Sequence, residues 1–435
     1  MGIGLGGQRL KDSASWSRRQ FVKIALASAG LLFAPTILGG AKAKVVVIGG
    51  GAGGATAARA LASHFQGLDI SLVEANWHYV TPFFSNRYLT GLRSLGSLTH
   101  SYEKVDLNPG VRVVHERVTK IDAEKKRVRL LGGRLLSYDR LIVAPGTDLI
   151  HDAIEGYDPA AEKVLPHAYN GTTADQWIIL RGQLQAMEDG GLVVITVPRR
   201  PYRCAPAPYE RASLIAAYLM RRKPRSKILI LDANQTFPMM DVMLESWDKH
   251  FGQMIEWVSS DFGGAVLALD PTTRSIMTAD DRFFASVANV IPPQRAGSLA
   301  QATGLASETG WCPVNPKTFE SLCHRDIHVL GDAIDAGDMP KSASAASSQA
   351  LVCAVAVGNA FTESSAPAPD LTNACYFLVR EGNAFVVGGR YRVNDGLIVG
   401  VEGFASEPGE DDGVRAATAK AADRWYADIT RKMFG

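Results

Sequence analysis

The sequence predicts an α/β chain in which helices cover parallel sheets. A β-branched run at 44–48 is typical of a buried parallel strand, and it leads into the glycine-rich stretch 49–54 and a small-residue helix at 55–62. A second strand-like run follows at 69–73, and another, at 192–197, opens a second region of the same kind. We therefore expect two Rossmann-like nucleotide-binding domains followed by a C-terminal α+β interface domain.

Length and composition are those of a soluble enzyme. The chain has 435 residues, of which 46% are hydrophobic and 8% aromatic, so it is long enough for two or three cores and too polar for a multispanning membrane protein. The formal net charge is +2, but residues 1–43 hold six basic residues against one acid, which leaves the rest of the chain near −3. This charge does not indicate a nucleic-acid partner.

The N-terminus has the order of an export signal. Arg18 and Arg19 precede the apolar run 24–38, and the Ala-Lys-Ala at 41–43 resembles a cleavage site. Paired arginines are typical of a twin-arginine signal, so we expect a signal peptide over residues 1–43 and export of the folded protein to the periplasm. The alternative is a membrane anchor, which the short apolar run disfavours, because spanning a bilayer takes ~20 residues.

The cysteines exclude two classes of site. There are five, Cys204, Cys312, Cys323, Cys353 and Cys375, and an odd number rules out a fully paired structural framework. No Cys-x-x-Cys-His occurs, so the chain binds no c-type haem of its own, and no spacing typical of a metal site is present. We expect Cys312, Cys323 and Cys353 to be buried and to act as small hydrophobic residues.

The glycine-rich stretch predicts a dinucleotide site. In the pattern Gly-x-Gly-x-x-Gly, Gly49 permits the tight turn, Gly51 lets the backbone approach a pyrophosphate, and Gly54, next to Gly53, allows the helix to pack on the strand. The phosphate would then lie at the helix N-terminus. Glu74 ends the second strand at the place expected for a carboxylate that binds a ribose hydroxyl. The alternative is a glycine-rich turn without a ligand.

Two later segments resemble motifs of flavoproteins with two dinucleotide domains, the glutathione reductase-like or disulfide reductase-like superfamily. Residues 138–147 resemble their strand-to-glycine crossover, which ends here at Gly146. Residues 327–333 resemble their late motif, in which an aspartate, here Asp332, contacts the flavin's ribityl or phosphate region. The resemblance implies FAD. Prolines and arginines, not glycines, follow the strand at 192–197, so we infer that NAD(P)H is not the electron donor.

Most of the chain after the signal resembles the flavoprotein subunit of flavocytochrome c sulfide dehydrogenase. The most specific matching stretches are 202–213, 291–297 and 310–314. The resemblance implies an enzyme that oxidises sulfide and passes the electrons through FAD to a c-type cytochrome subunit, with which it forms a heterodimer. Since this chain has no haem motif, the haem must belong to that second subunit.

The same resemblance implies a redox-active cysteine pair. Two cysteines of that family, which match Cys204 and Cys375, form a disulfide above the flavin ring. Hydrosulfide would attack one sulfur to give a persulfide, and the released thiolate would pass an electron pair to the flavin. The alternative is a structural disulfide or two unrelated buried thiols. Glu210 is the candidate proton acceptor, and its alternative role is a first-turn acid that favours the helix dipole.

Three further positions bear on the cofactor. Asn86 belongs to a Ser-Asn pair of the family, three residues after the position at which many members carry a cysteine bonded to FAD. That position is Pro82 here, which has no nucleophile, so we expect non-covalent FAD. Lys341 precedes a small-residue helix and could stabilise reduced, anionic flavin near its N1/C2 edge, or be an ordinary surface lysine.

The motifs predict a domain plan. We expect an FAD-binding domain split between 44–150 and 295–360, a second nucleotide-like domain at 151–294 that carries Cys204, and a C-terminal domain at 370–435 in which an antiparallel sheet brings Cys375 to the flavin. Two other functions remain open. One is a sulfide:quinone oxidoreductase-like enzyme, and the other is a sulfur-carrier or electron-transfer module with a vestigial flavin.

Overall fold

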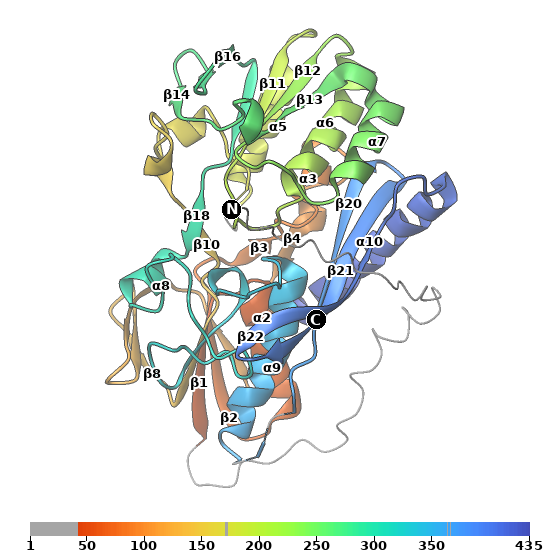
Figure 1. Cartoon of the computed structure of the whole chain (residues 1–435). Coiled ribbons are helices and arrows are strands. Elements are labelled where there is room, and N and C mark those ends of the chain that lie inside the picture. The colour runs from red at the N-terminus through yellow and green to blue at the C-terminus, as the bar shows by residue number, and fades with distance from the viewer. Residues whose placement is uncertain (1–41, 170–172, 363, 366) are drawn as a thin grey trace, which may run out of the picture.

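The computed structural model describes residues 42–169, 173–362, 364–365 and 367–435. The twin-arginine motif and the apolar run after it lie outside the described residues. The described chain forms two lobes with an α/β architecture, and a sheet from the C-terminal part runs along one side of both (Figure 1).

The first lobe is built on a five-stranded parallel sheet with strand order β19-β9-β1-β2-β5. Its strands are β1 (Ala43–Ile48), β2 (Leu68–Val73), β5 (Val111–Val114), β9 (Arg140–Val143) and β19 (Ile327–Val329). Valine, isoleucine and leucine side chains on the central strands are almost fully buried, as expected when helices and loops cover both faces of a parallel sheet.

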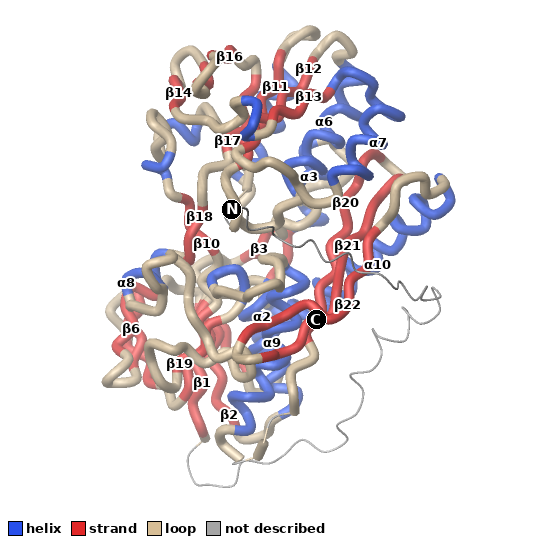
Figure 2. Tube along the Cα trace, viewed as in Figure 1, coloured by secondary structure: helices blue, strands red, loops and turns tan. Residues whose placement is uncertain are grey.

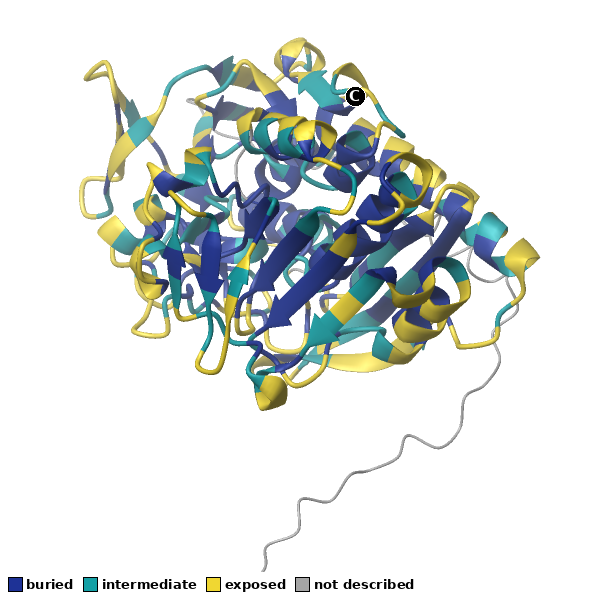
Figure 3. Ribbon diagram, turned by 90° about the horizontal axis from the view of Figure 1, so that it is seen from above, coloured by how far each residue is buried: buried dark blue, intermediate teal, exposed yellow. Residues whose placement is uncertain are grey.

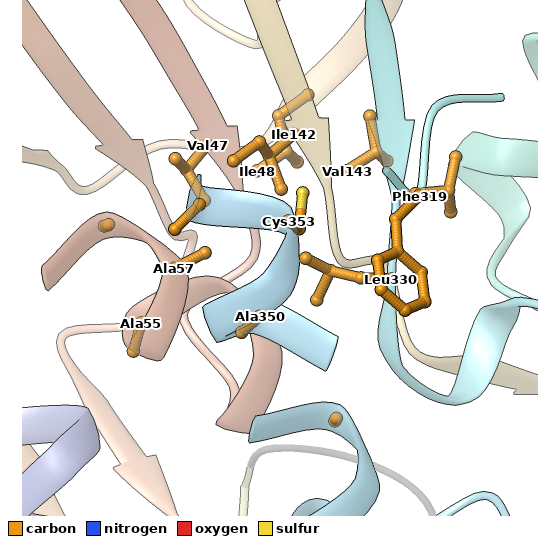
Figure 4. Packing of buried hydrophobic residues seen from close by; sticks show 14 of the residues in the cluster. Val47, Ile48, Ala55, Ala57, Ile142, Val143, Phe319, Leu330, Ala350 and Cys353 are labelled. Atoms are coloured by element: carbon orange, nitrogen blue, oxygen red, sulfur yellow. The ribbon is translucent and has the colours of Figure 1, made fainter. Parts of the chain in front are cut away.

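Two helices with small side chains pack together beside this sheet. They are α2 (Ala52–His64) and α9 (Ala343–Asn359), which contact each other closely. Figure 4 shows Ala57 of α2 and Cys353 of α9 close to Ile48 and Ile142 of the sheet, and all four side chains belong to one buried cluster. Small residues let the two helices approach, which explains why these stretches are rich in alanine.

The second lobe repeats the plan with a four-stranded parallel sheet of order β13-β12-β11-β17. Its strands are β11 (Leu192–Val197), β12 (Lys227–Asp232), β13 (Ile255–Val258) and β17 (Val287–Val290), and its helices are α5 (Asp175–Ala186), α6 (Ala207–Arg222) and α7 (Met240–Phe251). The two Rossmann-like regions predicted from the sequence are therefore present. In Figure 3 the strands of the sheets are mostly buried, whereas the loops around them are exposed.

The chain passes between the lobes through a two-stranded antiparallel ribbon. Strand β10 (Thr147–Leu149) leaves the first lobe, and β18 (Gln294–Ala296) returns to it. Both lie between the lobes in Figure 2. The ribbon lies close to residues 150 and 295, between which the chain forms the second lobe.

The C-terminal part is a three-stranded antiparallel sheet and a long helix. The sheet consists of β20 (Leu371–Arg380), β21 (Asn383–Asn394) and β22 (Leu397–Ala405), and the helix is α10 (Asp412–Phe434). Strand β20 contacts α9 of the first lobe and α6 of the second. The antiparallel sheet predicted for this part of the chain is therefore present. Within the described residues no helix combines the length and apolarity needed to cross a membrane.

Shorter elements complete the described fold. They are β3 (His78–Val80), α3 (Ser85–Leu89), β4 (Thr99–Ser101), α4 (Glu103–Asp106), β6 (Val118–Asp122), β7 (Arg127–Leu130), β8 (Leu135–Ser137), β14 (Ala268–Asp270), β15 (Ser275–Met277), β16 (Arg282–Phe284), α8 (Ser298–Ala302) and the 3₁₀ turn η6 (Gly331–Ala333).

Candidate active site

A cavity of about 510 Å³ opens where the two lobes and strand β20 meet. Most of the site residues predicted from the sequence line it, namely Gly49, Gly51, Gly53, Glu74, Pro82, Asn86, Gly146, Cys204, Glu210, Asp332 and Cys375. Gly54 and Lys341 do not line it. Residues from all three parts of the chain therefore line the cavity.

The glycine loop leaves one end of the cavity open to a ligand. Gly49 has a φ of +94°, and a Cβ there would lie 2.3 Å from the carbonyl oxygen of Ala144. A Cβ on Gly54 would lie 1.8 Å from the carbonyl oxygen of Gly49, so this glycine serves packing. Gly51 precedes α2 and provides no side-chain cap, which leaves backbone N–H groups of the helix N-terminus facing the cavity. This arrangement fits a pyrophosphate.

Glu74 holds the glycine loop in place. Its Oε2 accepts a 2.8 Å hydrogen bond from the backbone N–H of Gly50, and its Oε1 accepts two from the backbone and side-chain nitrogens of Asn76, each at 2.9 Å. The carboxylate is buried but lines the cavity. Because each carboxylate oxygen has a second lone pair, it can still accept a bond from a ligand hydroxyl.

Asp332 supplies an unsatisfied buried atom at the other side of the cavity. It lies in η6, directly after β19, and its Oδ1 is buried without a hydrogen-bond partner among the described residues. Burial raises the pKa of this carboxyl, against the charges of Arg203 and Lys341. A buried polar atom without a partner is costly in free energy, so this oxygen fits a ligand that donates a hydrogen bond to it.

Lys341 lies behind this turn and not in the cavity. Its ammonium donates to the backbone carbonyls of Asp332 at 3.0 Å and Ile334 at 2.6 Å, and it sits 3.6 Å from the ring centroid of Trp311. Burial lowers its pKa to about 8. The side chain thus holds the Asp332 turn, and its effect on a flavin stays a prediction.

Cys204 occupies a strained position in the loop before α6. Its φ is +50°, in the left-handed region that residues other than glycine rarely adopt. The Cys204 N–H donates to the carbonyl of Lys341 at 2.8 Å, and the Tyr169 hydroxyl donates to the carbonyls of Cys204 and Arg203. Burial raises the pKa of the Cys204 thiol, as do Cys375 and Glu210, while Arg203 lowers it.

Cys375 faces the same cavity from β20. Its Sγ lies 3.6 Å from Oδ1 of Asn373, which also accepts a 2.6 Å bond from the Ser342 hydroxyl. Burial raises the pKa of this thiol, and the contacts with Ser342 and Asn373 oppose the shift. Both cysteines are unpaired thiols in this structure, and both line the same cavity.

Glu210 is fixed by neighbours from two other elements, α3 and β20. Its Oε2 accepts a 2.7 Å bond from the side chain of Asn86, and its Oε1 accepts a 2.9 Å bond from the backbone N–H of Leu378. Asn86 is itself held by the guanidinium of Arg211, whose Nε donates to its Oδ1 at 2.9 Å. Burial raises the pKa of Glu210, and these hydrogen bonds oppose it. The carboxyl lies in the same cavity as the two thiols.

Several residues of the cavity were not expected from the sequence. They are Tyr169, Arg203, Ser342, Asn373 and Trp425, of which all but Asn373 line it directly. Asn373 had a signal, because it stands two positions before Cys375 on a strand and therefore shares its face. Arg203 is adjacent to Cys204 in sequence. Ser342 is likewise adjacent to the predicted Lys341, whereas Tyr169 and Trp425 come from distant segments with no local signal.

The remaining cysteines divide into two kinds. Cys312 and Cys353 are fully buried, as predicted. The prediction was wrong for Cys323, which is exposed, because the chain bends outward after Ser321 and carries Cys323 to the surface.

Three family profiles match the chain. Residues 43–178 match pyridine nucleotide-disulphide oxidoreductase, residues 178–292 match the central part of the sulfide dehydrogenase (flavocytochrome c) flavoprotein chain, and residues 367–434 match flavocytochrome c sulphide dehydrogenase, flavin-binding. The last two cover the segments that carry Cys204 and Cys375.

Solved structures share the fold at low sequence identity. The sulfide:quinone oxidoreductase of Aquifex aeolicus is 16% identical with a TM-score of 0.71, over 90% of this chain and 92% of its own. An NAD-dependent persulfide reductase from A. fulgidus is 18% identical with a TM-score of 0.62, over 87% and 77%. A ferredoxin reductase from Rhodopseudomonas palustris is 18% identical with a TM-score of 0.61, over 80% and 82%.

Proposed function

Because this chain belongs to the family of flavoprotein subunits of flavocytochrome c sulfide dehydrogenase, we propose that it oxidises sulfide at Cys204 and Cys375 and passes the electrons to a c-type cytochrome subunit. The observation that carries the proposal is the presence of these two thiols in one cavity. They stand 171 positions apart, on different parts of the chain, and line one cavity with a buried carboxyl beside them.

The cofactor is FAD. The glycine loop with the N-terminus of α2 would hold its pyrophosphate, Glu74 a ribose hydroxyl, and the unpartnered Oδ1 of Asp332 a hydroxyl of the ribityl region. When bound, FAD supplies an acceptor for an electron pair that can afterwards be released as single electrons.

We propose that this FAD is held without a covalent bond. Pro82 lines the cavity at the position where a cysteine would be needed, and it carries no nucleophile. The described lining contains no histidine and no thiol other than Cys204 and Cys375, which the reaction itself uses.

The reaction needs the cysteine pair in its oxidised form. Hydrosulfide then attacks one sulfur of the disulfide, so that a persulfide forms on that cysteine and a thiolate is released on the other. Glu210, whose raised pKa results from burial, accepts the proton of the persulfide. Arg203 is the charge that stabilises a thiolate on Cys204, since it lowers the pKa of that group.

The cellular setting follows from the same proposal. The paired arginines at the N-terminus support export in the folded state to the periplasm, where an oxidising environment lets a disulfide persist. The electron acceptor is a haem-bearing partner that forms a heterodimer with this chain, because no haem-attachment sequence occurs in it.

An anaerobic titration of the purified holoprotein with sulfide tests the proposal. The flavin absorbance should bleach in the wild type and in Cys353→Ser, which alters a buried thiol outside the cavity, but not in Cys204→Ser or Cys375→Ser. Reoxidation by a soluble c-type cytochrome should be fast. Wild-type protein that stays oxidised under sulfide would refute sulfide oxidation, and reoxidation by a quinone analogue alone would refute the cytochrome partner.

A further inference from the structure

A second pair of cysteines lies behind the Asp332 turn, outside the cavity. Val314 and Ser321 form an antiparallel bridge, and on either side of it Asn315 N–H donates to Glu320 at 2.8 Å and Leu322 N–H donates to Pro313 at 3.1 Å. Cys312 and Cys323 come next on the two segments, directly beyond Pro313 and Leu322, where the chain bends outward at Cys323.

The geometry of that position suits a disulfide. The bridge between Val314 and Ser321 is a non-hydrogen-bonded pair, and in a regular antiparallel ladder the pair two positions on is of the same kind, with opposite Cα atoms ~4.5 Å apart and side chains on the same face. Disulfides join Cα atoms that are roughly 4.4 to 6.8 Å apart.

The two thiols also interact electrostatically. Burial raises the pKa of Cys312 to about 12, and Cys323 is the next largest cause of the shift. Cys312 is fully buried and Cys323 is exposed, so one thiol of the pair is open to reagents and the other is shielded. The sulfide reaction proposed above uses neither of them.

The pair is attached to a part of the structure that matters for the cofactor. The backbone N–H of Cys312 donates to the carbonyl of Ala333 at 2.9 Å, and its carbonyl accepts from Asp335 at 3.0 Å. Trp311, the preceding residue, lies under the ammonium of Lys341, which holds the carbonyl of Asp332. A link from Cys312 to Cys323 would therefore fix the strand that supports the Asp332 turn.

We propose that Cys312 and Cys323 form a second, reversible disulfide that locks the 312–323 hairpin behind the Asp332 turn. A low-molecular-weight disulfide is the oxidant. The Cys323 thiolate attacks one of its sulfurs, which forms a mixed disulfide and releases one small thiol. The Cys312 thiolate then attacks the Cys323 sulfur and releases the second small thiol. Two protein thiols are oxidised, one small disulfide is reduced, and the two protons end on the released thiols.

Thiol counting tests the proposal without measuring activity. The holoprotein carrying both Cys204→Ser and Cys375→Ser keeps three cysteines, Cys312, Cys323 and Cys353. After incubation with oxidised glutathione and unfolding under acid quench, alkylation should find one thiol instead of three, and peptide mapping should find Cys312 linked to Cys323. Dithiothreitol should restore all three thiols.

Two further variants serve as controls in the same background. Cys353→Ser should still form the link, whereas Cys323→Ser, at an exposed position, should fold normally and keep both remaining thiols free. Formation of the link should be faster at higher pH, because the resolving thiol of Cys312 must ionise. Three free thiols, or stable glutathionylation of Cys323 without the internal link, would overturn the proposal.

Discussion

Asn86 and Glu210 are joined by a buried 2.7 Å hydrogen bond although 124 positions separate them in the chain. The bond connects α3 to α6 of the second lobe, on which α3 packs, and the other oxygen of Glu210 accepts from Leu378 of the C-terminal sheet. One carboxylate therefore links α3, α6 and β20 at the cavity.

Replacing Glu210 by Gln should destabilise the protein as well as remove a proton acceptor. The new amide nitrogen would face a donor, either Leu378 N–H or the Asn86 amide, and a buried donor without a partner costs about 1–3 kcal/mol. Urea unfolding of wild type and variant measures the loss. The exposed Glu188→Gln is the control and should change stability by less than about 0.5 kcal/mol. An unchanged midpoint for Glu210→Gln would contradict the role of this carboxylate.

Alkylation of the reduced holoprotein should report the protonation of Cys204. Its pKa is raised above the usual 9.0, so the reaction with iodoacetamide should be slow at pH 7 and accelerate above pH 9. Arg203→Gln should slow it further, because the positive charge lowers the pKa, and Arg203→Lys should restore most of the rate. Mass spectrometry of the Cys204 peptide gives the rates, and equal rates in all three proteins would exclude the charge effect.

The same raised pKa values predict how stability depends on pH. Folded, reduced protein holds the protons of Cys204 and Cys375 more tightly than the unfolded chain does. The resulting stability is fully present below about pH 9 and is lost as pH rises through the folded values. Melting temperatures of the reduced wild type should therefore fall more steeply above pH 9 than those of the Cys204→Ser, Cys375→Ser double variant. Parallel curves would contradict this.

The pKa of Lys341 should make stability depend on pH in the opposite direction from the pKa values of the two cysteines. Its folded pKa is about 8 against an ordinary 10.5, so between these values the unfolded chain binds more protons than the folded protein. Stability from this group therefore rises with pH across that window. The melting temperature of wild type minus that of Lys341→Met should therefore increase from pH 8 to pH 10. A difference that shrinks would show that the ammonium is stabilised in its charged form.

The glycine loop offers a steric test of the cofactor site. A Cβ on Gly54 would meet the carbonyl oxygen of Gly49 at 1.8 Å, so Gly54→Ala must move the helix from the strand and should lower both FAD content and stability, the latter by about 1–3 kcal/mol. Gly96 has open space around its would-be Cβ, and Gly96→Ala is the matched control. Full FAD occupancy in Gly54→Ala, measured by absorbance after gel filtration, would show that the loop does not bind the cofactor.

Features set by local pattern could be predicted from the sequence. The buried runs at β1 and β11, the glycine turn before α2 and the antiparallel strands after residue 370 each follow from short stretches of side chains. Gly49 and Glu74 belong to such stretches and line the cavity, while their roles toward a cofactor stay predictions. The pairing of Cys204 with Cys375 came only from the family resemblance.

Features set by long-range packing could not be predicted. Nothing near Lys341 in sequence indicates that its ammonium would donate hydrogen bonds to the backbone carbonyls of Asp332 and Ile334 behind the turn. Ser342 and Asn373 meet beside Cys375 only because β20 packs on α9. Cys323 looked like a core residue by its type alone, and the bend after the preceding bridge placed it at the surface.

Cys375 and Leu378 lie on the same strand, β20, and this restricts which substitutions the C-terminal sheet can accept. The strand positions a sulfur with one residue and orients the Glu210 carboxylate with another. Any shift of β20 against α6 would move the Cys375 sulfur and change the hydrogen bonding of the Glu210 carboxylate in one step. Substitutions that change how this C-terminal sheet packs would therefore change the positions of Cys375 and Glu210 together. Selection cannot alter one of these positions through the sheet without altering the other.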